Sequence, residues 1–179
     1  MSPIGHCAVA LASKCAVPKV PLGILLFSAV FLDVLAVALA YRGIEGSASQ
    51  GAPWSHGLFM SAVWSCLAAL LALRVYRSVR AGIAVGLMVF SHWILDLISH
   101  PIPFNTFSWR SWTWTYGHPL RSDLPLLFSN SPRVGFGLYN SMSAVQATLL
   151  EVGMFVLGAL VYVSVSWQRR HTAILRREQ

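Results

Sequence analysis

Long apolar runs separated by polar segments dominate this chain. Four of these runs are long enough to cross the hydrocarbon core of a bilayer as a helix, which takes about 20 residues. They cover about residues 21–41, 56–74, 82–98 and 143–167. A fifth apolar run, residues 3–17, is too short to span, so we expect a half-membrane or interfacial helix there. The pattern therefore predicts an all-α integral membrane protein, a single domain with four transmembrane helices and a short N-terminal helix.

The segments between and after the runs have the composition of regions outside the hydrocarbon. Residues 42–53 are rich in Gly and Ser, which is typical of a loop. Residues 101–140 are rich in Pro, Gly and Trp, and their alternating aromatic residues are typical of a segment at the lipid headgroups. Residues 168–179 form a basic tail that we expect to lie along the anionic inner surface of the membrane.

Composition supports the membrane prediction and excludes other classes. The 179 residues are 56% hydrophobic and 11% charged, and the mean hydropathy is +0.62. In a soluble protein a net charge of +7 would suggest nucleic-acid binding, but here the basic residues lie at the ends of apolar runs. We therefore expect the lipid bilayer, and no nucleic acid, as a partner. The three cysteines form no CxxC pair, so neither a zinc ribbon nor a disulfide framework is indicated.

The distribution of basic residues predicts the orientation. The turn between the second and third spans, the N-terminal region and the tail together carry nine Lys and Arg residues, whereas the two loops on the other side carry four. The positive-inside rule then places both termini in the cytoplasm and both polar loops outside the plasma (inner) membrane.

Candidate chemistry begins with SHWILDLISH, residues 91–100. His92, Asp96 and His100 recur every four residues and therefore lie on one face of a helix. Imidazole and carboxylate groups at this spacing can share a metal ion or a proton. Alternatively, they are polar residues that only form hydrogen bonds within a helix bundle.

The depth of other ionisable residues favours a shared site. Asp33 lies eight residues before Tyr41 at the outer end of the first span, His92 lies eight before His100, and Glu151 lies eight after Ser143 at the start of the last span. At 1.5 Å per residue, each is roughly 12 Å below the outer boundary, with Asp96 one turn above His92.

The N-terminal helix brings a further histidine to this level. His6 precedes Lys19 by 13 residues and Asp33 follows it by 14, so a hairpin at Lys19 places both at nearly the same height. His56 stands at the outer mouth of the second span. Each ionisable group inside hydrocarbon costs about 2.5–3.5 kcal/mol on insertion scales. We therefore expect these groups to face one cavity, where they neutralise one another or bind a cation.

Histidine nitrogen and carboxylate oxygen are ligands for zinc, manganese or iron. The sequence predicts a divalent-metal centre, with zinc as the first candidate, whose ligands are His6, Asp33, His56, His92 and Asp96. The set suffices for one ion with an open position or for two ions bridged by a carboxylate. Asp96 or Glu151 is the candidate catalytic general base, or orients a ligand histidine.

The order of these motifs resembles that of the YdjM (DUF457) family of membrane-bound proteins, proposed to be metal-dependent hydrolases. The matching residues are Gly5-His6, Asp33, Ser55-His56 and Ser91-His92 through Asp96. A bacterial subgroup is similar also at Asp123-Leu124-Pro125-Leu126 and at Gly135 through Ser141. The broader family often has further acid and histidine positions where this chain has Val34-Leu35-Ala36 and Gly51 through Trp54, which favours one ion over two.

The resemblance implies a bacterial inner-membrane protein with a metal centre that opens to the outer side. The expected function is metal-dependent hydrolysis of a phosphoester or a lipid-linked molecule near the outer leaflet. Two other functions stay open at this point. The polar residues can form a proton or ion relay without catalysis, or they can be structural residues of a small membrane protein.

Overall fold

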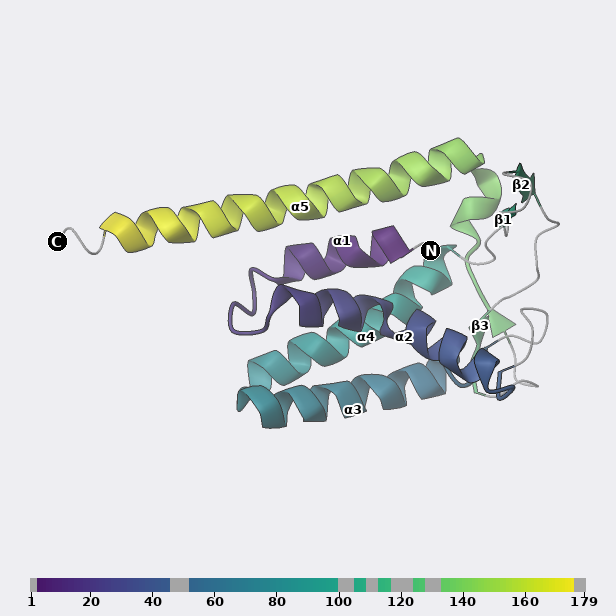
Figure 1. Cartoon of the computed structure of the whole chain (residues 1–179), viewed down its shortest axis with the longest axis horizontal. Helices are drawn as coiled ribbons and strands as arrows, with labels where there is room; N and C mark the ends of the chain where they lie inside the picture. Colours follow the sequence, from purple (N-terminus) through teal and green to yellow (C-terminus); the bar gives the residue numbers. More distant parts are fainter. Residues whose placement is uncertain are drawn as a thin grey trace.

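The computed structural model describes residues 3–45, 52–99, 105–108, 113–116, 124–127 and 133–175. This part of the chain is mainly helical (Figure 1). Its α-helices are α1 (Pro3–Ser13), α2 (Leu22–Tyr41), α3 (Leu58–Tyr76), α4 (Val79–Ser99) and α5 (Ala144–Leu175). Four of them, α2 to α5, are long and apolar enough to cross a membrane, and α1 is a shorter apolar helix. The predicted all-α membrane fold is confirmed.

The predicted outer loop contains short elements in its described parts. Strand β1 (Asn105–Ser108) pairs antiparallel with β2 (Thr113–Tyr116), and β3 (Leu124–Pro125) pairs antiparallel with β4 (Arg133–Val134). A 3-10 helix, η2 (Leu138–Ser141), precedes α5. Much of this loop lies outside the described residues, and so do His100 and Asp123 of the motifs quoted above.

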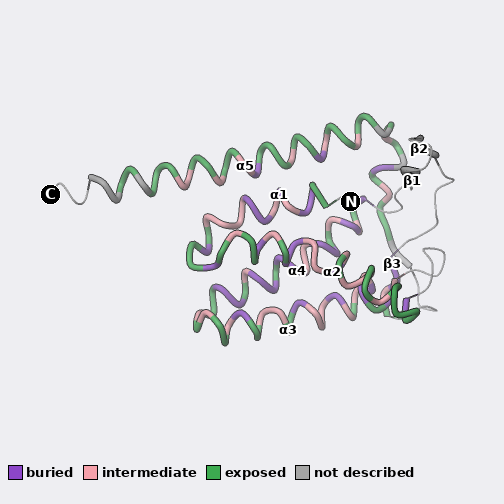
Figure 2. Tube along the Cα trace, viewed as in Figure 1, coloured by how far each residue is buried: buried purple, intermediate pink, exposed green. Residues whose placement is uncertain are grey.

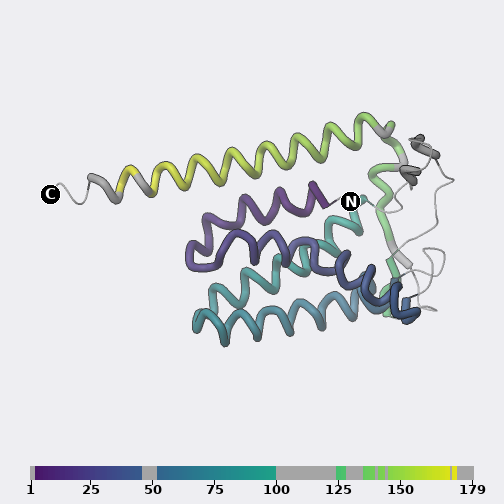
Figure 3. The backbone as a smooth tube through the Cα atoms, in the orientation of Figure 1, coloured from purple at the N-terminus to yellow at the C-terminus, as the bar shows by residue number. Residues whose placement is uncertain are grey.

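Local chemistry accounts for the helix ends at the two hairpins. The predicted N-terminal helix ends early, at Ser13, and the turn that follows is held by Lys14, whose Nζ donates to the carbonyls of Pro18 and Val20. At the other hairpin, Arg77 ends α3 in the left-handed conformation at φ 48°. Ser78 then caps α4, because its hydroxyl accepts the backbone N–H of Ala81 at 3.3 Å. The tube in Figure 3 shows the resulting antiparallel course of α1 and α2 and of α3 and α4.

Helix α4 is the central helix of the bundle. It packs against α1, α2 and α3, whereas α5 packs along α1. Half of the α4 span is buried, against 11% of the α5 span, and Figure 2 shows this contrast in colour. Small residues allow the close approach: a Cβ at Gly86 of α4 would meet Ala69 of α3, and one at Gly158 of α5 would overlap the carbonyl of Ala8.

Two apolar clusters support the position of the polar residues. The larger fills the half of the bundle next to the two hairpin turns; it contains Ala10, Val17, Val20, Leu25, Ala29, Ala72, Ala81, Val85 and Met88. The smaller contains Leu32, Val89, Trp93 and Leu124, so strand β3 packs onto α2 and α4. Leu32 directly precedes Asp33, and Val89 lies about one helical turn before His92. This second cluster therefore fixes α2 and α4 at the level of the polar residues.

A candidate metal centre

Four segments of the chain bring their ionisable side chains together. His6 comes from α1, Asp33 from α2, and His56 from the turn before α3. His92 and Asp96 come from successive turns of α4. We call these five residues the His/Asp cluster. Two overlapping groups within it have ligand atoms that all lie within 4.8 Å of one another: His6, Asp33 and His92, and His56, His92 and Asp96.

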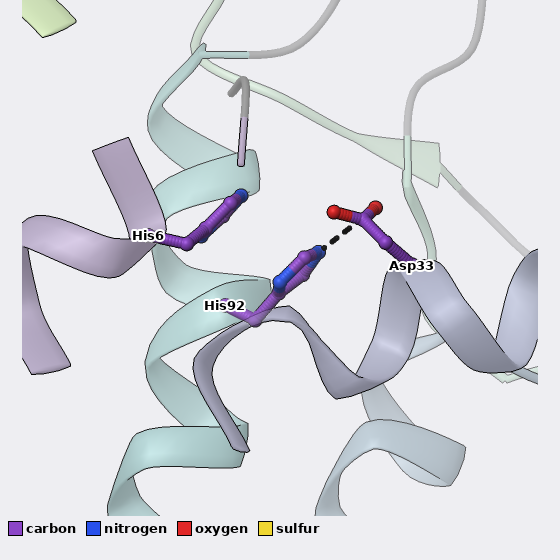
Figure 4. A group of neighbouring side chains, drawn as sticks. All are labelled: His6, Asp33 and His92. Carbon is purple, nitrogen blue, oxygen red and sulfur yellow. Dashed lines mark ion pairs between the residues drawn. The ribbon is translucent and has the colours of Figure 1, made fainter. Parts of the chain in front are cut away.

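The predicted hairpin does bring His6 and Asp33 to one level. The imidazoles of His6 and His92 are stacked, with ring centroids 3.8 Å apart and planes 8° from parallel. Figure 4 shows this stack, with the Asp33 carboxylate approaching the His92 ring from α2. The His92 Nε2 is 3.4 Å from Asp33 Oδ1.

Ligand atoms of His56, His92, Asp33 and Asp96 lie close together in five pairs. The Nε2 atoms of His56 and His92 are 3.2 Å apart, and each is 3.4 Å from Asp33 Oδ1. Asp96 Oδ2 is 3.3 Å from His92 Nε2 and 3.6 Å from His56 Nε2. Tetrahedral zinc with ligands at about 2.0–2.2 Å separates neighbouring ligand atoms by about 3.3–3.6 Å. The spacing therefore suits a small divalent ion.

The hydrogen bond of His92 Nδ1 determines which ring nitrogen has its lone pair available to the cluster. His92 Nδ1 is 2.8 Å from the carbonyl oxygen of Ala29, and a carbonyl can only accept. Nδ1 therefore carries the proton, and in the neutral ring Nε2 presents its lone pair to the cluster.

The same reasoning applies to His56. Its Nδ1 is 2.8 Å from Ser55 Oγ, which is itself 3.0 and 2.9 Å from the two carboxylate oxygens of Glu45. The single Ser55 proton points to the Glu45 carboxylate, so Ser55 Oγ accepts the proton of His56 Nδ1. In the neutral ring His56 Nε2 is then also unprotonated, and two lone pairs face each other at 3.2 Å. This contact is repulsive unless a cation or a proton lies between them.

Burial differs around the cluster. His6, His92 and Asp96 are 1%, 0% and 3% exposed, whereas the side chains of His56 and Asp33 are 12% and 37% exposed. The cluster is therefore closed on the side of α1 and α4 and accessible beside Asp33.

His6 is buried without a hydrogen-bond partner on either ring nitrogen, within the described residues. Its Nε2 lies 3.4 Å from Asp96 Oδ1, while the other Asp96 oxygen faces His56 and His92. An unsatisfied buried polar group costs about 1–3 kcal/mol. A bound cation would relieve this cost, and the Asp96 carboxylate is placed to bridge His6 to the other histidines.

Glu151, the residue of the last span predicted as a candidate general base, is held by a tyrosine. It is 6% exposed, and its carboxylate accepts the hydroxyl of Tyr139 at 2.8 Å. Burial and this hydrogen bond raise the pKa of the Tyr139 phenol. Neither of the two groups that could hold a metal ion within the described residues includes Glu151, whereas Asp96 belongs to one of them. The catalytic roles of Glu151 and Asp96 stay predictions.

Two residues next to the cluster were not predicted as part of the site. Glu45 lies in the Gly- and Ser-rich segment after α2, which the sequence indicates only as a polar loop. Ser55 entered only as the neighbour of His56 in a motif. A folded-back acid of this kind leaves no periodic signal, because loop residues have no fixed direction relative to a helix face.

Comparisons of the chain with protein-family models, curated proteins and solved structures found no match. The resemblance to the YdjM family therefore stays a prediction from the motifs. The assignment that the structure itself supports is a membrane protein with buried His and Asp groups that can hold a metal ion.

Proposed function

We propose that this chain is a membrane-embedded, metal-dependent hydrolase of the YdjM type, with the His/Asp cluster as its metal centre. The observation that carries the proposal is the 3.2 Å approach of the His56 and His92 Nε2 atoms, both of which present lone pairs. Two carboxylates complete the group at 3.3 to 3.6 Å. A cation bound among these atoms would turn this arrangement from repulsive to stabilising, and so would a proton between the two nitrogens.

Charge favours a divalent cation. The cluster combines three imidazoles with two carboxylates, and Asp96 is nearly fully buried. With neutral rings the cluster carries two negative charges, which are expensive in a low-dielectric interior unless they are paired. Nitrogen and oxygen ligands favour zinc, manganese or iron. We propose zinc first, because the five ligand separations are close to those between neighbouring ligands of tetrahedral zinc.

The centre suits hydrolysis because it is buried on one side and accessible on the other. A bound ion would supply Lewis-acid activation of water and substrate. The chain would hold that ion through His56, His92 and both Asp residues. The α1 and α4 side of the cluster excludes water, and a substrate would approach beside the partly exposed Asp33. We propose a phosphoester or a lipid-linked molecule, because the centre lies at a depth that lipid substrates reach from the headgroup region.

The loop end of the bundle, where the cluster lies, would face outward from a bacterial inner membrane. This orientation rests on the bias of Lys and Arg toward the opposite end. The C-terminal end of α5 would then be cytoplasmic. Helix α1 begins at the loop end of the bundle, whereas α5 ends at the opposite end (Figure 1). This orientation would therefore place only the C-terminal end in the cytoplasm, in contrast to the expectation that both termini are cytoplasmic.

Elemental analysis of purified protein tests the metal centre. We expect the wild type to contain zinc, manganese or iron in near-stoichiometric amount, and His92→Ala to lose it. His171→Ala is the matched control, because His171 is exposed on the far part of α5 and lies outside the cluster. Hydrolysis of an aryl phosphate should stop on chelation and return on reloading. A wild type without metal, or turnover that survives chelation, would contradict the proposal.

A proton relay is the second candidate function, favoured by the same close pair of nitrogens. A single proton between His56 Nε2 and His92 Nε2 also removes the repulsion between the lone pairs. Proton flux into proteoliposomes distinguishes the two. Flux that persists after metal removal and is lost in His92→Ala supports the relay, whereas its absence in the metal-free protein supports the hydrolase.

A further inference from the structure

A buried carboxylate outside the cluster is connected to His56 by a serine. Glu45 is 5% exposed although it lies in a loop. Its Oε1 accepts the backbone N–H groups of Trp54 and Ser55 at 2.9 and 2.7 Å, and both of its oxygens lie within 3.0 Å of Ser55 Oγ. The loop after α2 therefore folds back onto the turn that carries His56.

With Glu45 as a carboxylate, the hydrogen bonds among Glu45, Ser55 and His56 allow one assignment of donors and acceptors. Ser55 is fully buried and has one hydroxyl proton, which the Glu45 carboxylate takes. The Ser55 oxygen is then available only as an acceptor toward His56 Nδ1 at 2.8 Å. The His56 ring is thereby held in the tautomer and orientation that direct its Nε2 to the cluster. The negative charge at the far end also makes that nitrogen a better ligand.

From this geometry we propose that Glu45 and Ser55 are positioning residues for His56 as a metal ligand. The inference rests on the proposed metal centre and adds two residues to it. Ligand histidines in metal sites commonly donate their second N–H to an oxygen acceptor that is itself held in place. His92 follows the same rule with the carbonyl of Ala29. The two histidines thus differ, because the His56 acceptor is a side chain and can be changed by mutation.

A purely structural role for Glu45 is the competing explanation. The two backbone N–H groups that it accepts stabilise the turn before α3, and that alone would explain its burial. The explanations differ in what the Ser55 hydroxyl does. A structural role predicts lower stability with unchanged metal affinity in the folded protein. A positioning role predicts weaker and altered metal binding.

Two variants and one control separate the explanations. Ser55→Ala removes the acceptor of His56 Nδ1. Glu45→Gln keeps the shape and an oxygen for the backbone N–H groups, but its NH₂ can donate to Ser55, which frees the serine proton to point at His56. Ser65→Ala is the matched control, because Ser65 is a buried serine of α3 whose hydroxyl donates to the Ser61 carbonyl of the same helix at 2.6 Å.

The measurements are Zn²⁺ affinity by competition with a chromophoric chelator, the visible spectrum of the Co²⁺-loaded protein, and the melting temperature. We expect Ser55→Ala to weaken Zn²⁺ binding about 10- to 100-fold and to shift the Co²⁺ bands, as other outer-shell changes do. Glu45→Gln should shift the same bands with a loss of about tenfold or less and a near wild-type melting temperature. Ser65→Ala should match the wild type in affinity and spectrum.

The possible failures are distinguishable. A wild type that binds neither Zn²⁺ nor Co²⁺ overturns the proposed metal centre, and this inference with it. A wild type that binds both ions, with Ser55→Ala and Glu45→Gln equal to it in affinity and spectrum, overturns the positioning role alone. Variants that melt earlier, while the folded protein binds Zn²⁺ normally, would show that Glu45 and Ser55 only stabilise the turn.

Discussion

The two halves of this helix bundle use the same helices for different purposes. Next to the hairpin turns the core is apolar, with small and branched residues such as Ala10, Val20, Leu25 and Val85. Toward the loops, the same helices α1, α2 and α4 contribute four of the five residues of the His/Asp cluster, and the turn before α3 contributes His56. Apolar packing contributes stability without a partner of defined chemistry, whereas buried ionisable groups require one. The buried ionisable groups of the loop half therefore lower the stability of the fold unless they are paired, which is why we place the function there.

The cost is visible in individual contacts. His6 has no hydrogen-bond partner on its ring nitrogens within the described residues, and the Nε2 atoms of His56 and His92 face each other. Nothing comparable is needed for packing, because Leu or Met would fill the same space in a bundle. The cluster is therefore better explained by a ligand than by the stability of the fold.

The largest expected effect is on the polar half. Asp96→Asn keeps the shape of the side chain but removes a charge that faces three histidines. We expect Zn²⁺ affinity to fall by about 100-fold or more, because even outer-shell changes cost 10- to 100-fold. Chelator competition measures this. Unchanged affinity would remove Asp96 from the ligand set and leave it as the candidate general base.

A matched substitution in the apolar half should act on stability alone. Leu25 is fully buried in the larger apolar cluster, so Leu25→Ala should lower the free energy of unfolding by about 2–5 kcal/mol. The metal content should stay that of the wild type, because Leu25 belongs to the larger apolar cluster, which includes no residue of the His/Asp cluster. Thermal unfolding in detergent measures the change in stability, and elemental analysis measures the metal content. Loss of metal from the folded variant would mean that the apolar and polar halves of the bundle are coupled.

The smallest expected effect concerns the pair outside the cluster. Tyr139→Phe removes the hydroxyl that donates to Glu151 at 2.8 Å. A hydrogen bond to a charged group contributes about 1.5–3 kcal/mol, so stability should fall by up to that amount. Metal content should not change, because Glu151 belongs to neither described ligand group. Loss of metal in this variant would place Glu151 next to the ion and extend the cluster to α5.

Much of the fold follows from run lengths alone. The apolar runs predict the spans to within a few residues, and deviations have local causes. One example is the serine cap that starts α4 at Val79, earlier than the predicted residue 82. Another is α5, which continues to Leu175 through part of the predicted tail, because no proline or glycine interrupts residues 159–175.

The depth of the candidate site can also be predicted from the sequence, whereas the contacts among its residues cannot. A rise of 1.5 Å per residue places Asp33, His92 and Glu151 at one depth, but depth says nothing of direction around the helix axis. In the structure Asp33 turns to His92, while Glu151 turns to Tyr139. Glu45 was unpredictable for a stronger reason, since its position depends on how a loop folds back after α2.

The sequence by itself determined that this is a helical membrane protein, and it predicts a common depth for Asp33, His92 and Glu151, because hydrocarbon thickness and helical rise are fixed quantities. Only the tertiary structure decided which of those residues meet, which nitrogen of each candidate ligand histidine faces the cluster, and which oxygen atoms hold these histidines in place. The lateral order and rotation of the helices depend on side-chain packing, such as the close contacts at Gly86 and Gly158. Packing of that kind is a property of the assembled bundle and of no single helix.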